Sequence, residues 1–295
     1  MLTAGESVVD RERTIQAATP FLKWAGGKGQ LLAQYEPFFP TEPVRRYFEP
    51  FVGSGAVFFY LQARGLFERA HLSEVNAELI TCYLAVRDHV DDLIAALREH
   101  AREHAEGGAA HYYAVRAWDR APDWADAPLV QHAARMIYLN KTCYNGLWRV
   151  NSRGHFNVPM GRYRRPDILN EGRLRAASRA LQGVEAAVAG FGGVLERAEA
   201  GDFVYCDPPY VPLSATANFT SYSAAPFGED EQRRLAEVFA GLDRKGCRVM
   251  LSNSDTPLVR QLYRAFRIET VSARRNINSM RHKRGAVSEV VVLNY

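Results

Sequence analysis

The chain has 295 residues, 47% of them hydrophobic, which is enough for one large α/β domain or for one domain that carries an inserted lobe. The formal net charge of +4 is small, so a preference for an anionic partner must come from local basic clusters. Four cysteines without paired spacing argue against a disulfide framework or a zinc site. No segment approaches the roughly 18 apolar residues of a membrane span, and the first residues lack the pattern of a signal peptide. We therefore expect a cytoplasmic protein with no membrane, metal or obligatory protein partner.

Residues 1–18 show no sustained period, and we expect a flexible leader there. Residues 20–28 form a short apolar segment that breaks into a glycine pair and Lys28 before a helical pattern begins. A lysine in this position can hold an anion or belong to a plain loop. The spacing is not that of a phosphate-binding P-loop, because the full glycine pattern and the Ser or Thr after the lysine are missing.

Residues 46–59 predict a strand, a tight glycine turn and an apolar helix. Gly53 and Gly55 would let backbone amides approach a ligand, as in Rossmann-like nucleotide sites. Glu74 ends a second short strand 19 residues after Gly55, at the separation where such folds place a carboxylate for ribose hydroxyls. Glu74 could also be a simple acid at a helix start, but the two features together favour an adenosine-bearing cofactor.

From about Ala77 to Asn140 the pattern is helical. His100 and His104 lie one helical turn apart and could ligate a metal. The charged residues of both signs around them favour a solvated face instead, so no metal site is expected here.

Residues 141–165 hold six basic residues and no acid, interleaved with aromatic side chains. These are Lys141, Arg149, Arg153, Arg162, Arg164 and Arg165, with Tyr144, Trp148, Phe156 and Tyr163. Basic side chains neutralise phosphates, arginine and asparagine read base edges, and an aromatic ring can stack on an opened base step. We therefore expect this segment to contact nucleic acid.

The sequence Asp207-Pro208-Pro209-Tyr210 directly follows the apolar run 203–206, which predicts a buried parallel strand. Two prolines end the strand and prevent a helix, so the turn is expected to be rigid and exposed at the carboxyl edge of the sheet. If Asp207 and the Pro208 carbonyl each accept a hydrogen of an aromatic amine, the amine lone pair turns out of the ring plane toward an electrophile. Tyr210 would stack on the base, which would have to be flipped out of a duplex.

The remaining elements alternate as helix and strand up to residue 272, and a last strand, 287–294, follows without an intervening helix. Residues 212–222 read as a substrate clamp beside the turn, and Arg274, Arg275 and residues 281–284 form a second basic rim. The fold class predicted is α/β: a Rossmann-like mixed sheet, mostly parallel with a closing antiparallel hairpin strand. We expect a catalytic domain in residues 19–78 and 166–295, and an inserted, mainly helical DNA-recognition domain in residues 79–165.

The motifs at residues 21–28, 49–55 and 207–210, in this order with a helical insertion between them, resemble those of the Dam-type DNA adenine methyltransferases. Further runs at residues 144–147, 156–159, 161–163 and 213–220 extend the resemblance, which covers nearly the whole chain from Thr19 to Tyr295. The resemblance implies S-adenosylmethionine as the methyl donor and the six-amino group of adenine in duplex DNA as the acceptor.

The resemblance also implies roles for individual residues. The cofactor site would comprise Trp24, Lys28, Glu49, Phe51, Gly53, Gly55, Glu74 and Asp207, with Glu74 on the ribose. Arg149 would read a guanine, Leu147 and Pro159 would touch a thymine methyl, and Lys23 would contact the outer base pair. Tyr144 and Asn145 would lie beside the flipped base, and Arg162, Arg274 and Arg275 would contact the DNA. These matches imply a GATC target.

Two positions depart from the family pattern. Glu74 stands where the family commonly has aspartate, and Gly192-Gly193 stands where it often has an acid that contacts the cofactor adenine. Either Asp202 or backbone groups would have to contact the cofactor adenine in place of this acid, or the cofactor would bind weakly. The rival hypotheses are a methyltransferase that acts on RNA or on a protein glutamine amide, and a DNA-binding protein whose cofactor site has decayed.

Overall fold

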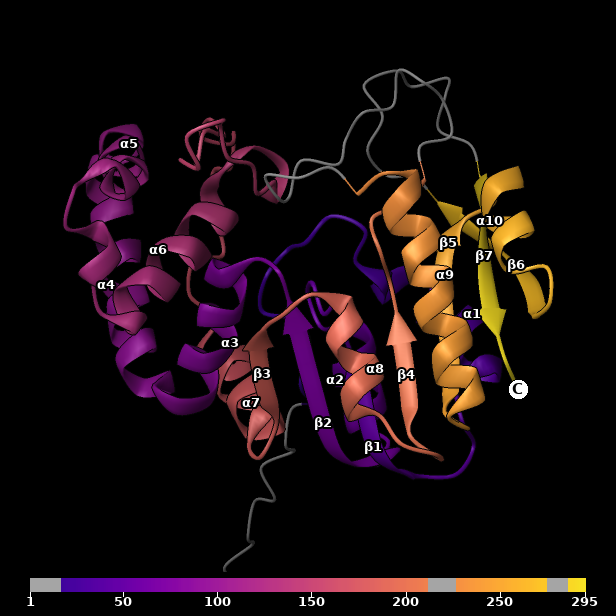
Figure 1. Ribbon diagram of the computed structural model, residues 1–295. Coiled ribbons are helices and arrows are strands. Elements are labelled where there is room, and N and C mark those ends of the chain that lie inside the picture. The colour runs from indigo at the N-terminus through magenta and orange to yellow at the C-terminus, as the bar shows by residue number, and fades with distance from the viewer. Residues whose placement is uncertain (1–16, 212–226, 275–285) are drawn as a thin grey trace, which may run out of the picture.

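The computed structural model describes residues 17–211, 227–274 and 286–295. The predicted leader at residues 1–16, the predicted clamp at residues 212–222, Arg275 and residues 281–284 lie outside the described residues. The chain forms a seven-stranded sheet in the order β3-β2-β1-β4-β5-β7-β6, with helices on both faces (Figure 1). No helix within the described ranges is both long and apolar enough to cross a membrane.

The strands are β1 Val44–Glu49, β2 Phe67–Glu74, β3 Glu185–Val188, β4 Phe203–Cys206, β5 Arg248–Ser254, β6 Arg267–Arg274 and β7 Ala286–Leu293. The helices are α1 Leu32–Tyr35, α2 Ala56–Gln62, α3 Ala77–Asp88, α4 Val90–Gly107, α5 Ala109–Ala117, α6 Leu129–Thr142, α7 Glu171–Leu181, α8 Val194–Arg197, α9 Glu229–Arg244 and α10 Pro257–Leu262. The predicted mixed α/β class is thereby confirmed.

The sheet reverses its strand order between β1 and β4. Strands β1, β2 and β3 proceed in one direction from this point, and β4 and β5 proceed in the other, all in parallel pairings. Strand β7 pairs antiparallel with both β5 and β6, so the predicted closing hairpin is present, with β7 inserted between its neighbours. Ligands of such sheets bind where the order reverses, outside the carboxyl ends of the strands.

Alternating strand residues divide the core into two layers, as the two-residue period of a strand requires. Tyr47 and Tyr205 belong to the layer that packs under α1 and α2, whereas Phe48, Val204 and Cys206 belong to the layer under α8, α9 and α10. Strand β4 is buried along its whole length, as the apolar run predicted. Both layers therefore hold β4 rigidly and fix the position of the turn that follows it.

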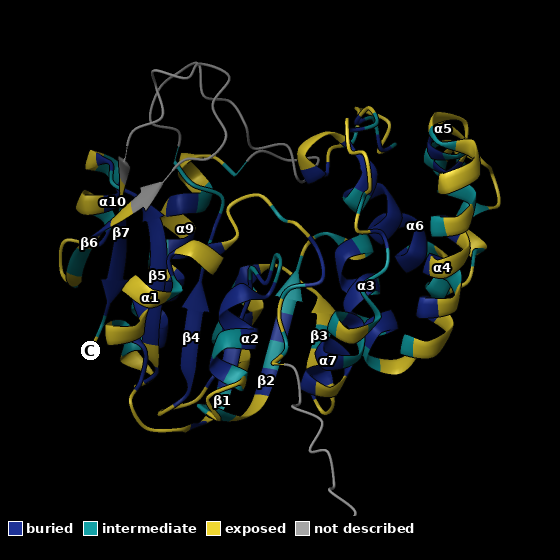
Figure 2. Ribbon diagram, turned by 180° about the vertical axis from the view of Figure 1, so that it is seen from behind, coloured by how far each residue is buried: buried dark blue, intermediate teal, exposed yellow. Residues whose placement is uncertain are grey.

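Helices α3 to α6 lie beyond the β3 edge of the sheet (Figure 1) and share the core of the α1 and α2 face. Figure 2 shows exposed residues along the outer side of α4 and α5, and buried residues on α6, which packs against α3 and α4. Arg135 of α6 is completely buried, and its Nη2 lies 2.7 Å from Asp119 Oδ2. Asp119 Oδ2 also accepts a hydrogen bond from the Phe156 amide, which ties the helices to the basic segment.

Strand β3 was not predicted from the sequence. Its four residues have the burial pattern exposed, intermediate, exposed, exposed, so they carry no apolar alternation. Its position comes from the ladder with β2, in which Glu74 is opposite Val188. An edge strand of this kind is set by backbone pairing rather than by side-chain burial.

Candidate active site

The carboxylate of Asp207, at the end of β4, is held by two donors on one oxygen. Lys28 Nζ forms an ion pair with Asp207 Oδ1 at 2.7 Å, and Ser252 Oγ donates to the same oxygen at 2.8 Å. Ser252 Oγ also lies 2.9 Å from the Tyr205 hydroxyl, which is then the donor of that bond, because the Ser252 hydrogen is directed at Asp207. Both contacts are therefore made to Oδ1, and neither involves Oδ2.

The sequence predicted an exposed turn, but the Asp207 side chain is only 18% exposed. Burial raises the pKa of Asp207, and the Lys28 ammonium and the Ser252 hydroxyl oppose this rise. The turn therefore holds Asp207 in a mostly buried position, where an electrostatic contact is stronger than in bulk water.

Two buried amide side chains hold the proline turn in place. Gln232 Nε2 donates to the Pro209 carbonyl at 2.8 Å, and Asn253 Nδ2 donates to Gln232 Oε1 at 3.0 Å. Gln232 is 1% exposed and Asn253 is completely buried. Sequence reasoning missed both residues and Ser252, although the polar run 252–256 directly after the apolar start of β5 was an available signal.

Tyr210 is oriented by the reversed strand β7. Its hydroxyl donates to Glu289 Oε2 at 2.7 Å, and Lys28 Nζ lies 4.6 Å from the ring centroid. Lys28 is 5% exposed and also donates to the Gly26 carbonyl at 2.7 Å. The lysine therefore lies between the Asp207 carboxylate and one face of the Tyr210 ring.

The glycine turn after β1 requires glycine at both predicted positions. Gly53 and Gly55 have φ of +48° and +69°, in the left-handed region. A Cβ on Gly55 would lie 2.6 Å from the Tyr83 hydroxyl, and one on Gly53 would lie 2.9 Å from Cδ1 of Trp24. Tyr83 donates to the Gly53 carbonyl at 3.0 Å, so α3 supports the turn from below.

Glu74 lies beside this turn at the carboxyl end of β2. Its Oε1 accepts from the Val75 amide at 2.9 Å. Burial raises the pKa of Glu74, while the amides of Val75, Asn76 and Gly53 favour its ionised form. The structure thus brings Glu74, Gly53 and Trp24 together in one group and Lys28 and Asp207 together in another.

Glu49, at the end of β1, is 2% exposed and accepts a hydrogen bond from the Tyr47 hydroxyl at 2.7 Å. Burial raises its pKa to about 8, with a smaller contribution from the Asp207 charge. Glu49 is therefore protonated at neutral pH and adds no second negative charge beside Asp207.

Phe51 belongs to an aromatic cluster with Phe191 and Phe227. Its ring stacks on Phe191 with centroids 5.5 Å apart, and Phe227 meets both rings at 5.8 Å. The Arg234 guanidinium lies 4.7 Å from the centroid of the Phe191 ring, and a Cβ on Gly192 would lie 3.0 Å from Arg234 Nη2. An arginine and two rings thus stand where the resemblance leads one to expect an acid.

Asp202 cannot take the place of that acid. It precedes β4, at the opposite end of the strand from Asp207, and Arg46 donates to both of its carboxylate oxygens, at 3.1 Å and 2.6 Å. Asp202 is 2% exposed and also accepts from the Glu199 amide. Two of the alternatives named for the missing acid therefore remain. Either backbone groups contact the cofactor adenine in its place, or the cofactor binds weakly.

The basic segment is joined to the N-terminal motif by a buried amide that sequence reasoning missed. Asn140 Oδ1 accepts from the Lys23 amide at 2.9 Å, and Asn140 Nδ2 donates to the carbonyls of Lys23 and Gly146 at 2.8 Å and 3.0 Å. The Lys23 ammonium lies 5.1 Å from the centroid of the Tyr163 ring. The side chain of Asn140 thus connects residues 117 positions apart.

The segment forms a loose antiparallel hairpin, with isolated bridges between Cys143 and Met160 and between Val150 and Phe156. The residues expected to contact DNA lie on its surface, exposed or half-buried: Tyr144, Asn145, Leu147, Arg149, Pro159 and Arg162. Arg149 Nε donates to Asn157 Oδ1 at 2.8 Å, which orients the guanidinium.

Two of the four aromatic residues in the segment are core residues and cannot stack on a base. Trp148 is 5% exposed and Phe156 is completely buried, and their rings pack with centroids 4.6 Å apart. Tyr144 and Tyr163 are exposed. Arg274 is the last residue of β6, and Arg275 lies outside the described residues.

An Asp-Pro-Pro-Tyr turn follows β4 at the reversal point of a Rossmann-like sheet, the arrangement that the sequence motifs predicted for a methyltransferase that acts on an aromatic amine. The profile of the D12 class N6 adenine-specific DNA methyltransferases matches residues 24–277, and the chain belongs to this family. The resemblance identified from the sequence motifs is therefore confirmed.

Three relatives match over nearly their whole lengths. The type II methyltransferase M.MjaIII of Methanocaldococcus jannaschii is 43% identical, with 94% of this chain and 99% of that protein covered. The type II methyltransferase M1.LlaDCHI of Lactococcus lactis subsp. cremoris is 40% identical, with 94% and 95% covered. The DNA adenine methylase of Escherichia coli K12 is 37% identical, with 92% and 94% covered.

Proposed function

We propose that this enzyme transfers a methyl group from S-adenosylmethionine to the six-amino group of an adenine that is flipped out of duplex DNA, within the sequence GATC. The observation that carries the proposal is the Asp207 carboxylate, which Lys28 and Ser252 hold by one oxygen at the reversal point of the sheet. The other oxygen is then available to an exocyclic amine.

The residues around the glycine turn fit the proposed cofactor. Glu74 offers carboxylate oxygens for the ribose hydroxyls, Trp24 packs on the turn, and the half-buried Phe51, backed by the Phe191 ring, offers an apolar ring face for an adenine. Gly53 and Gly55 keep the turn free of side chains. When bound, S-adenosylmethionine supplies an electrophilic methyl group on a positively charged sulfur.

The chemistry assigned to the protein is positional and electrostatic. Asp207 and the Pro208 carbonyl accept the two hydrogens of the amine, so the amine lone pair leaves the plane of the base. The raised pKa of Asp207 also makes its carboxylate a better acceptor for the proton that the amine loses after methylation. Tyr210, oriented by Glu289, offers the ring face that stacks on the base.

We assign residues 19–78 and 166–295 to catalysis and residues 79–165 to DNA recognition. The exposed basic hairpin supports this division, because it projects Arg149 and Arg162 from a rigid helical base. Arg149 would read a guanine, Leu147 and Pro159 a thymine methyl group, and Lys23 the outer base pair. Tyr144 and Asn145 would fill the space beside the flipped base, and Arg274 and Arg275 would contact the phosphates.

Methyl transfer from labelled cofactor to a short GATC duplex tests the proposal. We expect Asp207→Ala to abolish transfer while duplex binding is retained, and the exposed Asp230→Asn on α9 to behave as wild type. Labelling of RNA or of a glutamine-containing protein, with none of duplex DNA, would favour the rival substrates. Duplex binding without any cofactor binding would favour the decayed site.

The target sequence is tested by the pair Arg149→Ala and Arg153→Ala, two exposed arginines of the same hairpin. Arg149→Ala should reduce discrimination at the guanine by about 1–3 kcal/mol, the range for one bidentate base contact. Arg153→Ala should leave the sequence preference unchanged. Identical methylation patterns in the two variants, mapped by sequencing modified bases, would contradict the assignment of Arg149.

A further inference from the structure

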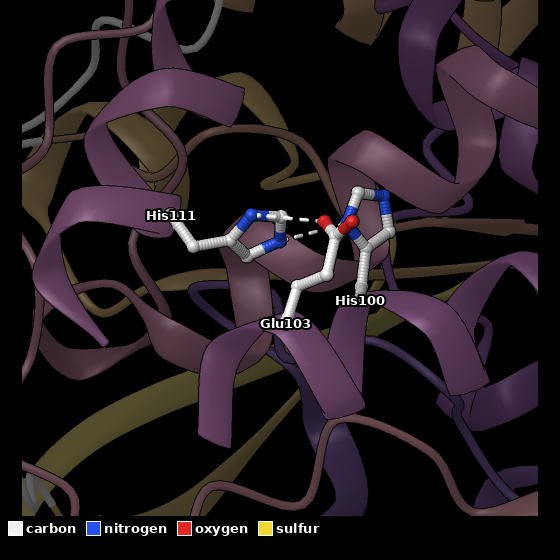
Figure 3. A group of neighbouring side chains, drawn as sticks. All are labelled: His100, Glu103 and His111. Carbon is white, nitrogen blue, oxygen red and sulfur yellow. Dashed lines mark hydrogen bonds and ion pairs between the residues drawn. The ribbon is translucent and has the colours of Figure 1, made fainter. Parts of the chain in front are cut away.

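Two histidines and a glutamate meet between α4 and α5 (Figure 3). His100 and Glu103 lie one helical turn apart on α4, and His111 comes from α5. His100 Nδ1 lies 3.1 Å from His111 Nε2, and His111 Nδ1 lies 3.1 Å from Glu103 Oε2. One ligand atom from each residue lies within 4.8 Å of the other two.

The sequence singled out His100 and His104, but the structure gives these two side chains different hydrogen-bond partners. His104 Nδ1 contacts the Tyr138 hydroxyl at 2.8 Å, whereas His100 meets His111 across the Gly107–Gly108 turn. Spacing along one helix could not reveal a partner on the next helix. The expectation of a solvated face was wrong for His100, which is 7% exposed.

The cluster is preorganised on rigid elements. The His100 ring stacks on Tyr138 of α6 with centroids 4.8 Å apart and an interplanar angle of 17°. The His111 side chain is 11% exposed, and that of Glu103 is 41% exposed. Glu103 therefore has room to turn toward a ligand, while the two imidazole rings are held.

The donor set indicates which kind of cation would bind. Two imidazoles and one carboxylate match zinc and its transition-metal neighbours, whereas magnesium and calcium prefer sets made only of oxygen. Zinc bonds to nitrogen and oxygen are about 2.0–2.2 Å long, so tetrahedral ligand atoms lie about 3.4 Å apart, near the spacing of the two ring nitrogens. His100 would carry its ring hydrogen on Nε2, which leaves Nδ1 free to bind the cation.

We propose that His100, Glu103 and His111 form a binding site for one divalent transition-metal ion of the zinc type. His100 and Glu103 also line an open hollow of about 410 Å³, next to Trp118, from which water can supply the remaining ligand. This proposal does not depend on the methyl-transfer chemistry.

A cation at this site would have a structural role in the helical insertion. It would lock α4 to α5, and α5 in turn supports the basic hairpin. Tyr112 of α5 donates from its hydroxyl to the Val158 carbonyl at 2.9 Å, and Arg116 Nη1 donates to the same oxygen at 3.3 Å. The metal would thus stabilise the surface that we assign to DNA recognition.

The full chain, freed of any affinity tag and of metal, should be titrated with Zn²⁺ by calorimetry and with Co²⁺ by visible absorption. We expect one equivalent to bind, with the d–d absorption of a four- or five-coordinate Co²⁺ site. Glu103→Gln and His111→Gln should each weaken binding at least ten-fold. His104→Gln, on the same helix but outside the cluster, should bind as wild type does.

Thermal unfolding provides a second readout. Zn²⁺ should raise the melting temperature of wild type and of His104→Gln, but not that of Glu103→Gln. The Glu103 side chain is partly exposed, so this substitution leaves the core intact. Absence of saturable binding would overturn the proposal and leave the cluster as a hydrogen-bonded chain. Equal affinities in His111→Gln and wild type, or an equal loss in His104→Gln, would also overturn it.

Discussion

The buried carboxyl group of Glu49 allows a test of the electrostatic environment around Asp207. The perturbation is Glu49→Gln, which keeps the shape of the side chain and an oxygen for the Tyr47 hydroxyl but removes the titration. The pKa of Glu49 is raised from 4.5 to about 8 by burial and, less strongly, by Asp207. The folded protein therefore retains a proton that the unfolded chain has already lost.

The sign of the effect follows from this difference in bound protons. Between pH 4.5 and 8 the unfolded state binds fewer protons than the folded state, so stability falls as the pH rises. The slope is about 1.4 kcal/mol per pH unit inside this window. Allowing for partial titration at pH 5, the loss between pH 5 and 7 is about 2 kcal/mol.

Urea unfolding of wild type and Glu49→Gln at pH 5, 6 and 7 measures this loss. Other titrating groups affect both proteins alike, so the difference between the two profiles isolates Glu49. We expect Glu49→Gln to gain about 2 kcal/mol relative to wild type across this range. Parallel profiles, within about 0.5 kcal/mol, would show that Glu49 is ionised in the folded protein and refute the reasoning.

Three further substitutions test other parts of the structure. Ser252→Ala removes one hydrogen-bond donor from Asp207 Oδ1. Because a hydrogen bond to a charged group contributes about 1.5–3 kcal/mol, we expect kcat to fall about ten-fold or more in steady-state assays, with DNA affinity retained. Asp119→Ala leaves the Arg135 guanidinium buried without its nearest charge and should cost about 3–5 kcal/mol in urea unfolding. Gly55→Ala should cost about 1–3 kcal/mol and weaken cofactor binding, because the residue has φ of +69° and a Cβ would clash with a tyrosine hydroxyl.

Matched positions serve as controls for the stability measurements. The exposed Asp126→Ala should leave stability unchanged, and a similarly small effect of Asp119→Ala would contradict its role as a buried anchor. Gly65 has φ of +65°, but a Cβ at this residue would meet nothing within 4 Å, so Gly65→Ala reports backbone strain alone. Equal costs at Gly65 and Gly55 would show that the hydroxyl contact is unimportant. An unchanged kcat in Ser252→Ala would show that Lys28 alone suffices to hold Asp207.

Strand β4 could be predicted because its side chains are buried on both faces, which gives an uninterrupted apolar run. Asp207 follows this strand directly, so the position of the proposed catalytic turn could be predicted from the sequence. Strand β3 could not be predicted, because an edge strand with exposed side chains is specified by backbone pairing to β2.

The residues of the candidate site also differ in how far the sequence could predict them. Residues inside short motifs, such as Gly53, Gly55 and Asp207, could be placed because turns and strand ends impose local backbone requirements. Asn253 and Gln232 could not, because their role depends on hydrogen bonds between elements distant in sequence. A buried polar residue looks ordinary in a sequence until its partner is known.

The basic hairpin shows why composition alone does not separate contact from support. Its charge pattern predicted a surface that contacts nucleic acid, yet Trp148 and Phe156 are buried and form a small core that supports this surface. The hairpin needs this core because it has only isolated bridges in place of a continuous ladder. Aromatic residues in a basic segment therefore serve two purposes, and only burial distinguishes them.

Asn140 explains how the two halves of the proposed site can act together. Its amide group holds the backbone of Lys23 on one side and the Gly146 carbonyl on the other. Lys23 adjoins Trp24, which packs on the Gly53 turn, and Gly146 adjoins the exposed Tyr144 and Asn145 pair. Asn140 therefore holds the backbone beside Trp24 and the turn that carries Tyr144 and Asn145 in one fixed arrangement, so that the two halves of the proposed site are joined by a buried side chain.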